Sequence, residues 1–404
     1  MTDFLGMETG DVFERFGYDL NAAAKRGDLE PVRCRDAEIS RIIDVLLRQT
    51  KHNPALVGAA GVGKTALAEG LAQRIVAGDV PAALRDSRII SLDHTALLAG
   101  TMYRGQYEER VRKLVAAVTS DPDVILFIDE MHNLMGQGSA MGVAMDAANM
   151  LKPALVKEDM RVIGATTAAE YERWIRSDPA LERRFQPVLV GELTGEQAME
   201  VLRARRSRLE HHHAVAISDD ALQAAITLTD KFVTDRAQPD KSIDVLDEAC
   251  AHAQATAHLP AELEQIVKER RKVDAAVRRR LARGEKLDDK NGDRPAGDDP
   301  LEAFTREIGP ALERIGAEIE KFFGNADRAG APEARRADGP TGKRADEPST
   351  EQAAKAKEES LLQRRDRLDG ELRAGLEKLG VVVTGADVAR AVAAAVGKRI
   401  EWTG

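Results

Sequence analysis

The stretch from Pro54 to Ile75 constrains the fold of this chain more than any other part of the sequence. An apolar run, Pro54–Val57, leads directly into Gly58-Ala-Ala-Gly-Val-Gly-Lys-Thr65, and a helix-forming run follows at once. A strand, a glycine-rich loop and a helix in this order are typical of a phosphate-binding P-loop. The glycines let backbone N–H groups point inward, toward an anion held at the helix N-terminus.

Two side chains of this loop carry distinct chemistry. We expect Lys64 to reach the β and γ phosphates of a nucleotide and the Thr65 hydroxyl to bind Mg²⁺. The alternative is a glycine-rich turn that binds nothing, and the motifs farther along the chain argue against it. The other predicted contacts come from the loop and the first helical residue, namely Gly58, Ala59, Ala60, Gly61, Val62, Gly63 and Ala66.

Composition excludes several classes of protein. The chain has 404 residues, enough for two or three domains, and its net charge of −9 argues against a general nucleic-acid binder. Its two cysteines, Cys34 and Cys250, exclude a disulfide framework and fit a reducing compartment. The N-terminal residues are too acidic for a signal peptide, and no apolar run reaches membrane-spanning length. We therefore expect a cytoplasmic protein that does not bind membranes.

The first half of the chain alternates short apolar strands with amphipathic helical stretches, which predicts an α/β fold with a parallel sheet. From Thr194 to His258 the apolar spacing becomes helical only, which predicts a small helical domain. The expected strands are Ala55–Val57, Ser87–Ser91, Val124–Ile128, Val162–Ala165 and Pro187–Val190.

Beyond residue 259 the sequence becomes charge-rich. Leu301 to Phe322 and Leu361 to Leu379 carry apolar residues at the spacing of a coiled-coil seam. Residues 288–300 and 324–360 are expected to be disordered, because such sequences cannot bury enough apolar surface. A solvated helical linker that acts only as a spacer is the alternative. The predicted divisions are an N-terminal segment 1–15, a large P-loop domain 16–192, a small helical domain 193–258, a helical, coiled-coil-like insertion 259–380 and a return segment 381–404.

A second motif follows the P-loop by about one α/β unit. Val124-Ile-Leu-Phe-Ile128 is a buried strand that ends in Asp129 and Glu130. In a P-loop fold this pair fits a Walker B motif, in which Asp129 holds the Mg²⁺ shell and Glu130 activates the attacking water. A pair of carboxylates at a strand end carries little weight alone, so the position after the P-loop decides this interpretation.

Polar residues with possible roles in catalysis also follow a later strand and a later helical stretch. Val162–Thr167 is an apolar strand that ends in hydroxyls, which places Thr167 near a γ-phosphate, although a strand can simply stop in threonines. Arg183 and Arg184 are adjacent, so they cannot share one helix face. An arginine supplied across a subunit boundary stabilises charge on the transferring phosphoryl group. The alternative is a solvated arginine pair.

Together these motifs resemble the first nucleotide-binding module of the Clp unfoldases and disaggregases (ClpB, ClpC and ClpA), a branch of the AAA+ ATPases. The resemblance covers about residues 16–258 densely. It implies a three-layer αβα P-loop domain with a small helical lid domain. Similar segments, besides the P-loop, are Phe16–Asn21, Pro31–Asp36, Gly105–Arg110, Asp146–Pro153, Leu181–Phe185 and Pro239–Asp244.

The resemblance also implies roles for individual residues in an ATP and Mg²⁺ site. Thr167 would be the sensor-1 residue, and Arg183 and Arg184 would be arginine fingers that reach a neighbouring subunit. Backbone around Val32 to Cys34 would line the adenine pocket. Lys241 and Asp244 would lie near the nucleotide on the small domain.

One element implied by the resemblance concerns a polypeptide substrate. Ala99–Tyr107 is similar to the family's axial pore loop, in which Tyr103 would grip an extended chain, and Gln137–Gly142 resembles the second pore loop. An aromatic ring on a loop of small residues can contact almost any side chain. Burial of Tyr103 in a core is the alternative, which its glycine-rich neighbours disfavour.

Some features depart from the family. We expect that the family's N-terminal domain and its second AAA+ module, with the loop that docks a Clp peptidase, are missing. Cys34 stands where the family usually has glycine, and Ala59-Ala60 replaces a more polar pair. The triple histidine His211–His213 lies inside the small domain without partner ligands, and we assign it no metal.

Two hypotheses therefore remain open. The first is a homo-hexameric, Mg-ATP-dependent unfoldase that threads unfolded or aggregated polypeptide through a pore, with an adaptor binding through the insertion. The second is a nucleotide-gated assembly or binding module that does not thread substrate. A remodeller of DNA lacks support because no basic groove is visible.

Overall fold

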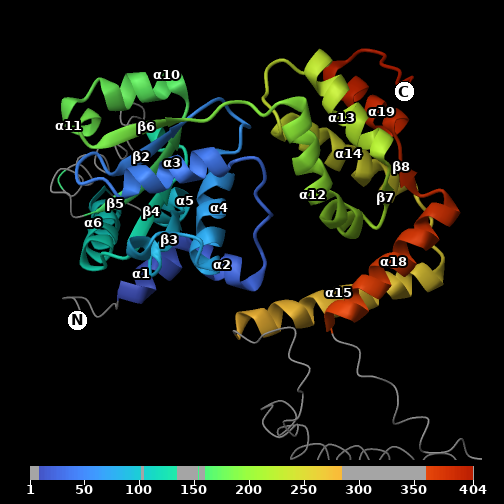
Figure 1. Cartoon of the computed structure of the whole chain (residues 1–404), viewed down its shortest axis with the longest axis horizontal. Helices are drawn as coiled ribbons and strands as arrows, with labels where there is room; N and C mark the ends of the chain where they lie inside the picture. Colours follow the sequence, from blue (N-terminus) through green and yellow to red (C-terminus); the bar gives the residue numbers. More distant parts are fainter. Residues whose placement is uncertain (1–8, 102–103, 134–152, 154–159, 284–360, 404) are drawn as a thin grey trace, which may run out of the picture. The chain divides into compact units, whose positions relative to one another are not determined.

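The computed structural model describes residues 9–101, 104–133, 153, 160–283 and 361–403. Its main sheet has six strands in the order β1-β3-β4-β5-β2-β6 (Figure 1). All neighbouring pairs are parallel except β1 and β3. The strands are β1 (Gly17–Asp19), β2 (Asn53–Val57), β3 (Arg88–Leu92), β4 (Val124–Ile128), β5 (Arg161–Thr166) and β6 (Phe185–Leu189).

Helices cover both faces of this sheet, as the alternation of apolar residues along β4 illustrates. Val124, Leu126 and Ile128 pack into one core, whereas Ile125 and Phe127 pack into the other. The first core is closed by α1 (Thr9–Phe16), α5 (His94–Leu98), α6 (Arg104–Ser120), the π-helical turn η2 (Tyr171–Arg176) and α11 (Pro179–Glu182). The second is closed by α2 (Leu20–Arg26), α3 (Asp36–Leu46), α4 (Lys64–Ala77) and the short turn η1 (Ala82–Leu84). This three-layer arrangement confirms the predicted αβα fold.

The sheet differs from the prediction at its edge. The short β1 was not expected; it pairs antiparallel with β3, with Tyr18 opposite Ser91. Asn21 holds this corner together, because its amide donates to Ser87 O and its Oδ1 accepts from Ile89 N, both at 2.9 Å. A strand of three residues has no periodicity to read, so only the tertiary pairing defines it.

The small domain packs α12 (Gly195–His213), α13 (Asp219–Phe232) and α14 (Asp240–Thr256) against α19 (Gly385–Val396) in one apolar core (Figure 1). The expectation of helix alone was wrong in one respect. Strand β7 (Ala216–Ile217) pairs in parallel with β8 (Val382–Val383), which comes from the far end of the sequence. Two-residue strands so far apart in sequence leave no pattern to detect.

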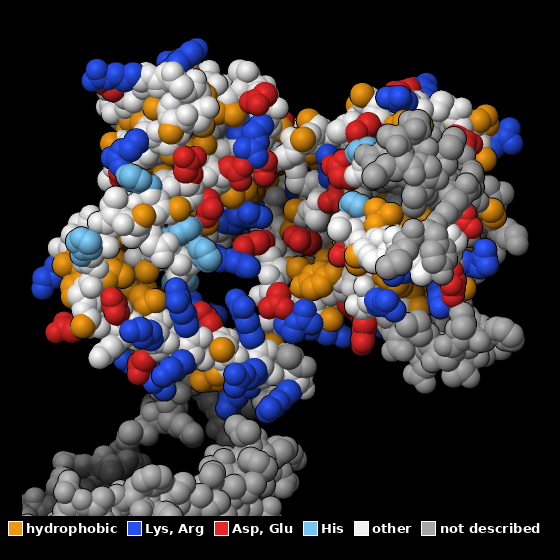
Figure 2. Space-filling view, turned by 180° about the vertical axis from the view of Figure 1, so that it is seen from behind, with side chains coloured by type: hydrophobic (Ala, Val, Ile, Leu, Met, Phe, Trp, Pro, Cys, Tyr) orange, Lys and Arg blue, Asp and Glu red, His pale blue; other side chains and the backbone are white. Residues whose placement is uncertain are grey.

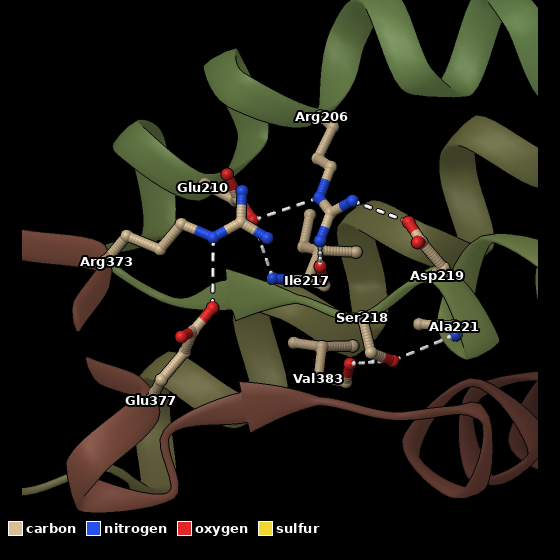
Figure 3. A network of polar contacts seen from close by, with 9 residues as sticks. All are labelled: Arg206, Glu210, Ile217, Ser218, Asp219, Ala221, Arg373, Glu377 and Val383. Atoms are coloured by element: carbon tan, nitrogen blue, oxygen red, sulfur yellow. Dashed lines mark hydrogen bonds and ion pairs between the residues drawn. The ribbon is translucent and has the colours of Figure 1, made fainter. Parts of the chain in front are cut away.

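Polar contacts hold the returning chain to the small domain (Figure 3). The Ser218 hydroxyl donates to Val383 O at 3.0 Å, and Arg206 binds Glu210 and Asp219 on either side of β7. Closer to the C-terminus, Trp402 Nε1 donates to an oxygen of Asp220 at 2.6 Å. The small domain is therefore completed by residues from the last part of the chain.

Two long helices, α15 (Ala261–Ala282) and α18 (Leu361–Leu379), pack side by side through apolar positions. Leu368, Leu372 and Leu376 of the predicted second stripe are buried in this contact. Lys and Arg side chains gather on the surface of this helix pair (Figure 2). The stripe from Leu301 to Phe322 and the stretches 288–300 and 324–360 lie outside the described residues. None of the helices described is long and apolar enough to cross a membrane.

Candidate nucleotide-binding site

The loop between β2 and α4 adopts the conformation that its glycines allow. Gly63 caps α4 with φ at 88°, a left-handed conformation that an L side chain rarely adopts. At Gly58 an added Cβ atom would lie 2.4 Å from Val190 O, so this position tolerates no side chain. The loop therefore runs close to the neighbouring backbone and ends at a free helix N-terminus, where an anion is stabilised.

Lys64 and Thr65 are the first two residues of α4, and their side chains have different partners. The Lys64 ammonium, almost fully buried, donates to Gly58 O at 3.1 Å and to Ala59 O at 2.9 Å. The Thr65 hydroxyl donates to Asp129 Oδ2 at 2.6 Å. A hydroxyl and a carboxylate oxygen are the hard ligands that Mg²⁺ prefers, so this pair fits the predicted cation position.

Glu130 follows β4 in an unusual backbone conformation, with φ at 48°. The next residue, Met131, fixes this turn because its N–H donates to Ala165 O of β5 at 2.9 Å and its side chain is fully buried. Gly164 makes room for Met131, since a Cβ atom there would lie 2.3 Å from Met131 Sδ. The turn leaves the Glu130 side chain about half exposed at the edge of the site.

These residues border a cavity of about 380 Å³. Among the predicted residues, the P-loop from Ala60 to Ala66, Val32, Asp129 and Glu130 line it. Arg33, inside the predicted stretch from Val32 to Cys34, lines it too. The sequence did not single out several others that share the cavity wall: Arg35, Glu69, Leu193, Arg205, Asp240 and Ile243. Phosphate-binding backbone, a cation position and apolar side chains thus meet in one place.

Arg35 is the most informative of the residues that the sequence analysis missed. It is buried, and its guanidinium donates to Val62 O at 2.7 Å and to Gly191 O at 2.9 Å. It also pairs with Glu38. Arg35 therefore ties the P-loop to the chain after β6. Its place within the family-like segment Pro31–Asp36 was the available signal.

Five predicted nucleotide contacts do not line the cavity: Gly58, Ala59, Cys34, Lys241 and Asp244. The Cys34 thiol approaches Glu200 Oε2 at 3.1 Å, and burial together with this carboxylate raises the pKa of Cys34 to about 11. Lys241 is nearly buried between Asp230 at 2.9 Å and Glu192 at 3.2 Å. Asp244 pairs with Arg236 at 2.5 Å. Cys34 has φ at 59°, which explains why glycine suits its position.

Thr167 caps the turn after β5 in a reciprocal arrangement with Glu170. The Thr167 hydroxyl donates to Glu170 Oε2 at 2.7 Å, and the Glu170 amide donates back to the hydroxyl at 3.4 Å. Although partial burial opposes ionisation of Glu170, the hydrogen bonds from Thr167 outweigh it and lower its pKa.

The remaining predicted residues lie away from the cavity or outside the described residues. Arg183 is exposed at the end of α11 and Arg184 is half-buried beside it, and neither lines the cavity. Tyr103 and the segment Gln137–Gly142 are not among the described residues. His211 contacts Asp369 and His213 contacts Asp247, both within the small-domain and helix-pair structure.

Comparison with protein families defines the class of protein. The family model "ATPase family associated with various cellular activities (AAA)" matches residues 54–193, and the "AAA lid domain" model matches residues 194–293. Together with the P-loop geometry, these matches place the protein among the AAA+ ATPases.

Curated relatives narrow this class. The chain is 52% identical over 267 residues to "Chaperone protein ClpB" of Aquifex aeolicus, which covers 66% of this chain and 26% of that protein. It is 52% identical over 264 residues to "ATP-dependent Clp protease ATP-binding subunit ClpC" of Staphylococcus epidermidis, covering 64% and 32%. The chain belongs to the Clp family of AAA+ ATPases. It spans about a third or less of the length of these relatives.

Solved structures agree with this assignment. The "S. cerevisiae Hsp104:casein complex, Extended Conformation" is 41% identical with a TM-score of 0.55, covering 60% of this chain and 42% of that chain. The "S. cerevisiae Hsp104-ADP complex" is 34% identical with a TM-score of 0.56, covering 70% and 54%.

Proposed function

We propose that the protein is a Mg-ATP-dependent, homo-hexameric unfoldase that threads polypeptide through a central pore. The observation that carries the catalytic part is the hydrogen bond of 2.6 Å between Thr65 Oγ1 and Asp129 Oδ2, with Glu130 next in the chain. This pairing supports the placement of a cation between the P-loop and the end of β4. The pore and the ring rest on the resemblance to Clp proteins.

The site residues divide the work of ATP hydrolysis. Backbone N–H groups from Gly61 to Thr65 bind the phosphate oxygens, and Lys64 turns from the loop carbonyls toward the β and γ phosphates. Thr65 and Asp129 would hold Mg²⁺, which would supply positive charge against the phosphates. Glu130 orients the attacking water and accepts its proton.

Assembly into a ring would complete the site. Arg183 is exposed and does not line the cavity of its own subunit, as expected for a group that acts on a neighbour. An arginine provided in this way raises the rate of P-loop enzymes by about 10³ to 10⁵. Movement of the lid against the large domain would then carry Tyr103 along the channel.

The catalytic assignment is tested by Glu130→Gln, which keeps the shape of the side chain and removes the proton acceptor. We expect Mg-ATP binding within about twofold of wild type and turnover reduced by about 10² or more. The control is Glu172→Gln, because Glu172 is exposed and pairs with Arg176 one turn away. Normal hydrolysis by the Glu130 variant would refute the assignment.

Threading is tested by ATPase rates with and without unfolded casein, comparing wild type with Tyr103→Ala. Stimulation by casein that disappears in the variant supports the pore. Turnover that ignores both casein and Tyr103 would favour a nucleotide-gated assembly or binding module instead. Mass measurements with and without Mg-ATP report whether the hexamer forms, and an adaptor can be sought through the insertion 259–380.

A further inference from the structure

A chain of polar contacts connects Thr167, directly after β5, with Glu130, two residues after β4. It begins at Glu170, whose Oε2 atom accepts from Thr167 Oγ1 at 2.7 Å, Thr167 N at 3.2 Å and Thr166 Oγ1 at 3.3 Å. This one oxygen therefore collects the hydroxyls of both threonines at the end of β5. These contacts hold the Glu170 carboxylate in the cap.

His132 connects Glu170 with Glu130. Its Nδ1 lies 2.9 Å from Glu170 Oε2, and its Nε2 lies 3.3 Å from Glu130 Oε2. The imidazole side chain is only 15% exposed, and Nδ1 is buried without a well-aligned hydrogen bond among the described residues. The ring is thus held between two carboxylates that belong to different strand ends.

A metal ion does not account for this arrangement as well as a bridge does. Glu130, His132 and Glu170 offer ligand atoms within 4.8 Å of one another. However, the two ring nitrogens of an imidazole direct their lone pairs or hydrogens to opposite edges, and here each edge faces a different carboxylate. A single ion cannot replace both contacts, whereas an imidazole spans them.

The backbone explains why Glu130 needs such support. Its left-handed conformation and the buried Met131 fix the main chain, but the Glu130 side chain is 46% exposed. A half-exposed glutamate side chain has several rotatable bonds, so its carboxylate can rotate away from the cavity. His132 supplies a contact on the protein side that limits this rotation.

We propose that Glu170 and His132 are positioning residues that hold the Glu130 carboxylate and couple its orientation to Thr167. This inference rests on the proposed role of Glu130 in hydrolysis. When Thr167 turns its hydroxyl to a γ-phosphate, Glu170 loses one donor and its contact with His132 changes. The orientation of the Glu130 carboxylate then depends on whether a γ-phosphate is bound, and side chains alone carry this dependence.

Glu170→Gln and His132→Ala test the bridge. Glutamine still completes a capping box, so Glu170→Gln alters the contact with His132 while it preserves the turn. We expect single-turnover rates about 10- to 100-fold below wild type, as for a small misplacement of a reacting group, with the Kd of a non-hydrolysable ATP analogue within about twofold. The double variant is expected to be no slower than the slower single variant.

Matched controls separate this role from general damage. Glu172→Gln changes an exposed glutamate two residues along, and His252→Ala changes an exposed histidine of α14. Both should hydrolyse ATP at the wild-type rate. His132→Gln places an amide near the former Nε2, and His132→Asn places one near Nδ1, so only the glutamine can reach Glu130. Turnover should therefore recover more in His132→Gln than in His132→Asn.

NMR provides a measurement that does not depend on ATP turnover. It records the ring ¹⁵N resonances of His132, which are assigned by their loss in His132→Gln. These resonances should shift in Thr167→Val and in Glu170→Gln, although neither variant touches the ring covalently. Unchanged resonances in both variants, or rate losses that multiply in the double variant, would overturn the bridge. A Glu130→Gln variant that hydrolyses ATP normally would instead refute the proposed catalytic site itself.

Discussion

The P-loop edge of the main sheet and the strand pair of the small domain use polar side chains in opposite ways. In the small domain, Arg206 binds Glu210, Asp219 and Ile217 O, while Glu210 also accepts from Ile217 N at 2.8 Å (Figure 3). At the P-loop edge, Lys64 donates to two loop carbonyls, and Thr65 and Asp129 bind each other beside a cavity.

The contrast shows how polar groups that stabilise a fold differ from those that bind a ligand. Arg206 shares its guanidinium among partners from three directions, so little bonding capacity is left. Lys64 and Asp129 are placed to bind a phosphate and a cation, because both residues line the cavity. Changes in the first region should therefore affect stability, and changes in the second should affect nucleotide binding.

Lys64→Ala is expected to have the largest effect and to leave the fold intact. Loss of a charged donor to phosphate costs up to about 3 kcal/mol, which corresponds to about a 100-fold increase in the Kd for ATP. Titration with a fluorescent nucleotide measures this change. Lys268→Ala is the control, because Lys268 is exposed and pairs with Glu264 on the same helix. Equal Kd values for both variants would contradict a role for Lys64 in binding.

Gly385→Ala should have the opposite profile. A Cβ atom at Gly385 would lie 2.2 Å from Trp402 Cδ1 and 2.6 Å from Asp220 Oδ2. Overpacking of this kind lowers the free energy of unfolding by about 1–3 kcal/mol, measurable by urea denaturation. Gly370→Ala, in a helix position with no neighbour within 4 Å, should be neutral or stabilising. A loss of nucleotide affinity in Gly385→Ala would break the separation between the two regions.

Asp369→Asn should lower stability by about 1 kcal/mol at neutral pH. Burial opposes ionisation of Asp369, but His211 and Arg270 outweigh it and lower its pKa below the usual value of 3.8. Because the folded-state pKa is depressed, this stabilisation is present above about pH 4 and is lost as the pH falls through the lowered value. The difference in Tm between variant and wild type should therefore shrink under acid. A constant difference would show that the charge is not the cause.

Cys34→Gly should have the smallest effect. Glycine removes the strain of the left-handed backbone at Cys34, but it also loses the thiol contact with Glu200 and adds flexibility to the unfolded chain. We expect a change of less than about 0.5 kcal/mol in unfolding free energy. Cys34→Val places a β-branched residue in the same conformation and should cost more. Thermal melts of both variants, with nucleotide titrations alongside, measure the difference.

The sequence predicted the P-loop edge well because its chemistry is contiguous. Gly58 to Thr65 is one unbroken motif, and Asp129 and Glu130 directly follow a strand that is apolar throughout. Spacing could therefore place Thr65 and Asp129 at the same edge of the sheet, after β2 and β4, which have β5 between them. The alternation of strands with helices and the helical lid followed from the apolar periodicity and from the family resemblance.

Contacts between distant residues were beyond this kind of reading. Arg35 acts through carbonyls of Val62 and Gly191, which have no side-chain signature. His132 lies two residues after Glu130, but its partner Glu170 follows a different strand, so only the folded chain reveals their proximity. Arg205 and Asp240 reach the cavity from the lid, where amphipathic spacing marks the core and not the polar rim.

The pairing of β7 with β8 has a consequence for how the sequence of this protein can change in evolution. The strand after α12 finds its partner only after the chain has left along α15 and returned along α18, whose apolar faces pack together. The domain is thus closed across a gap in the sequence, and the helix pair fixes the two ends of that gap near each other. Whatever sequence occupies it can be exchanged as a cassette, while the lid core stays the same.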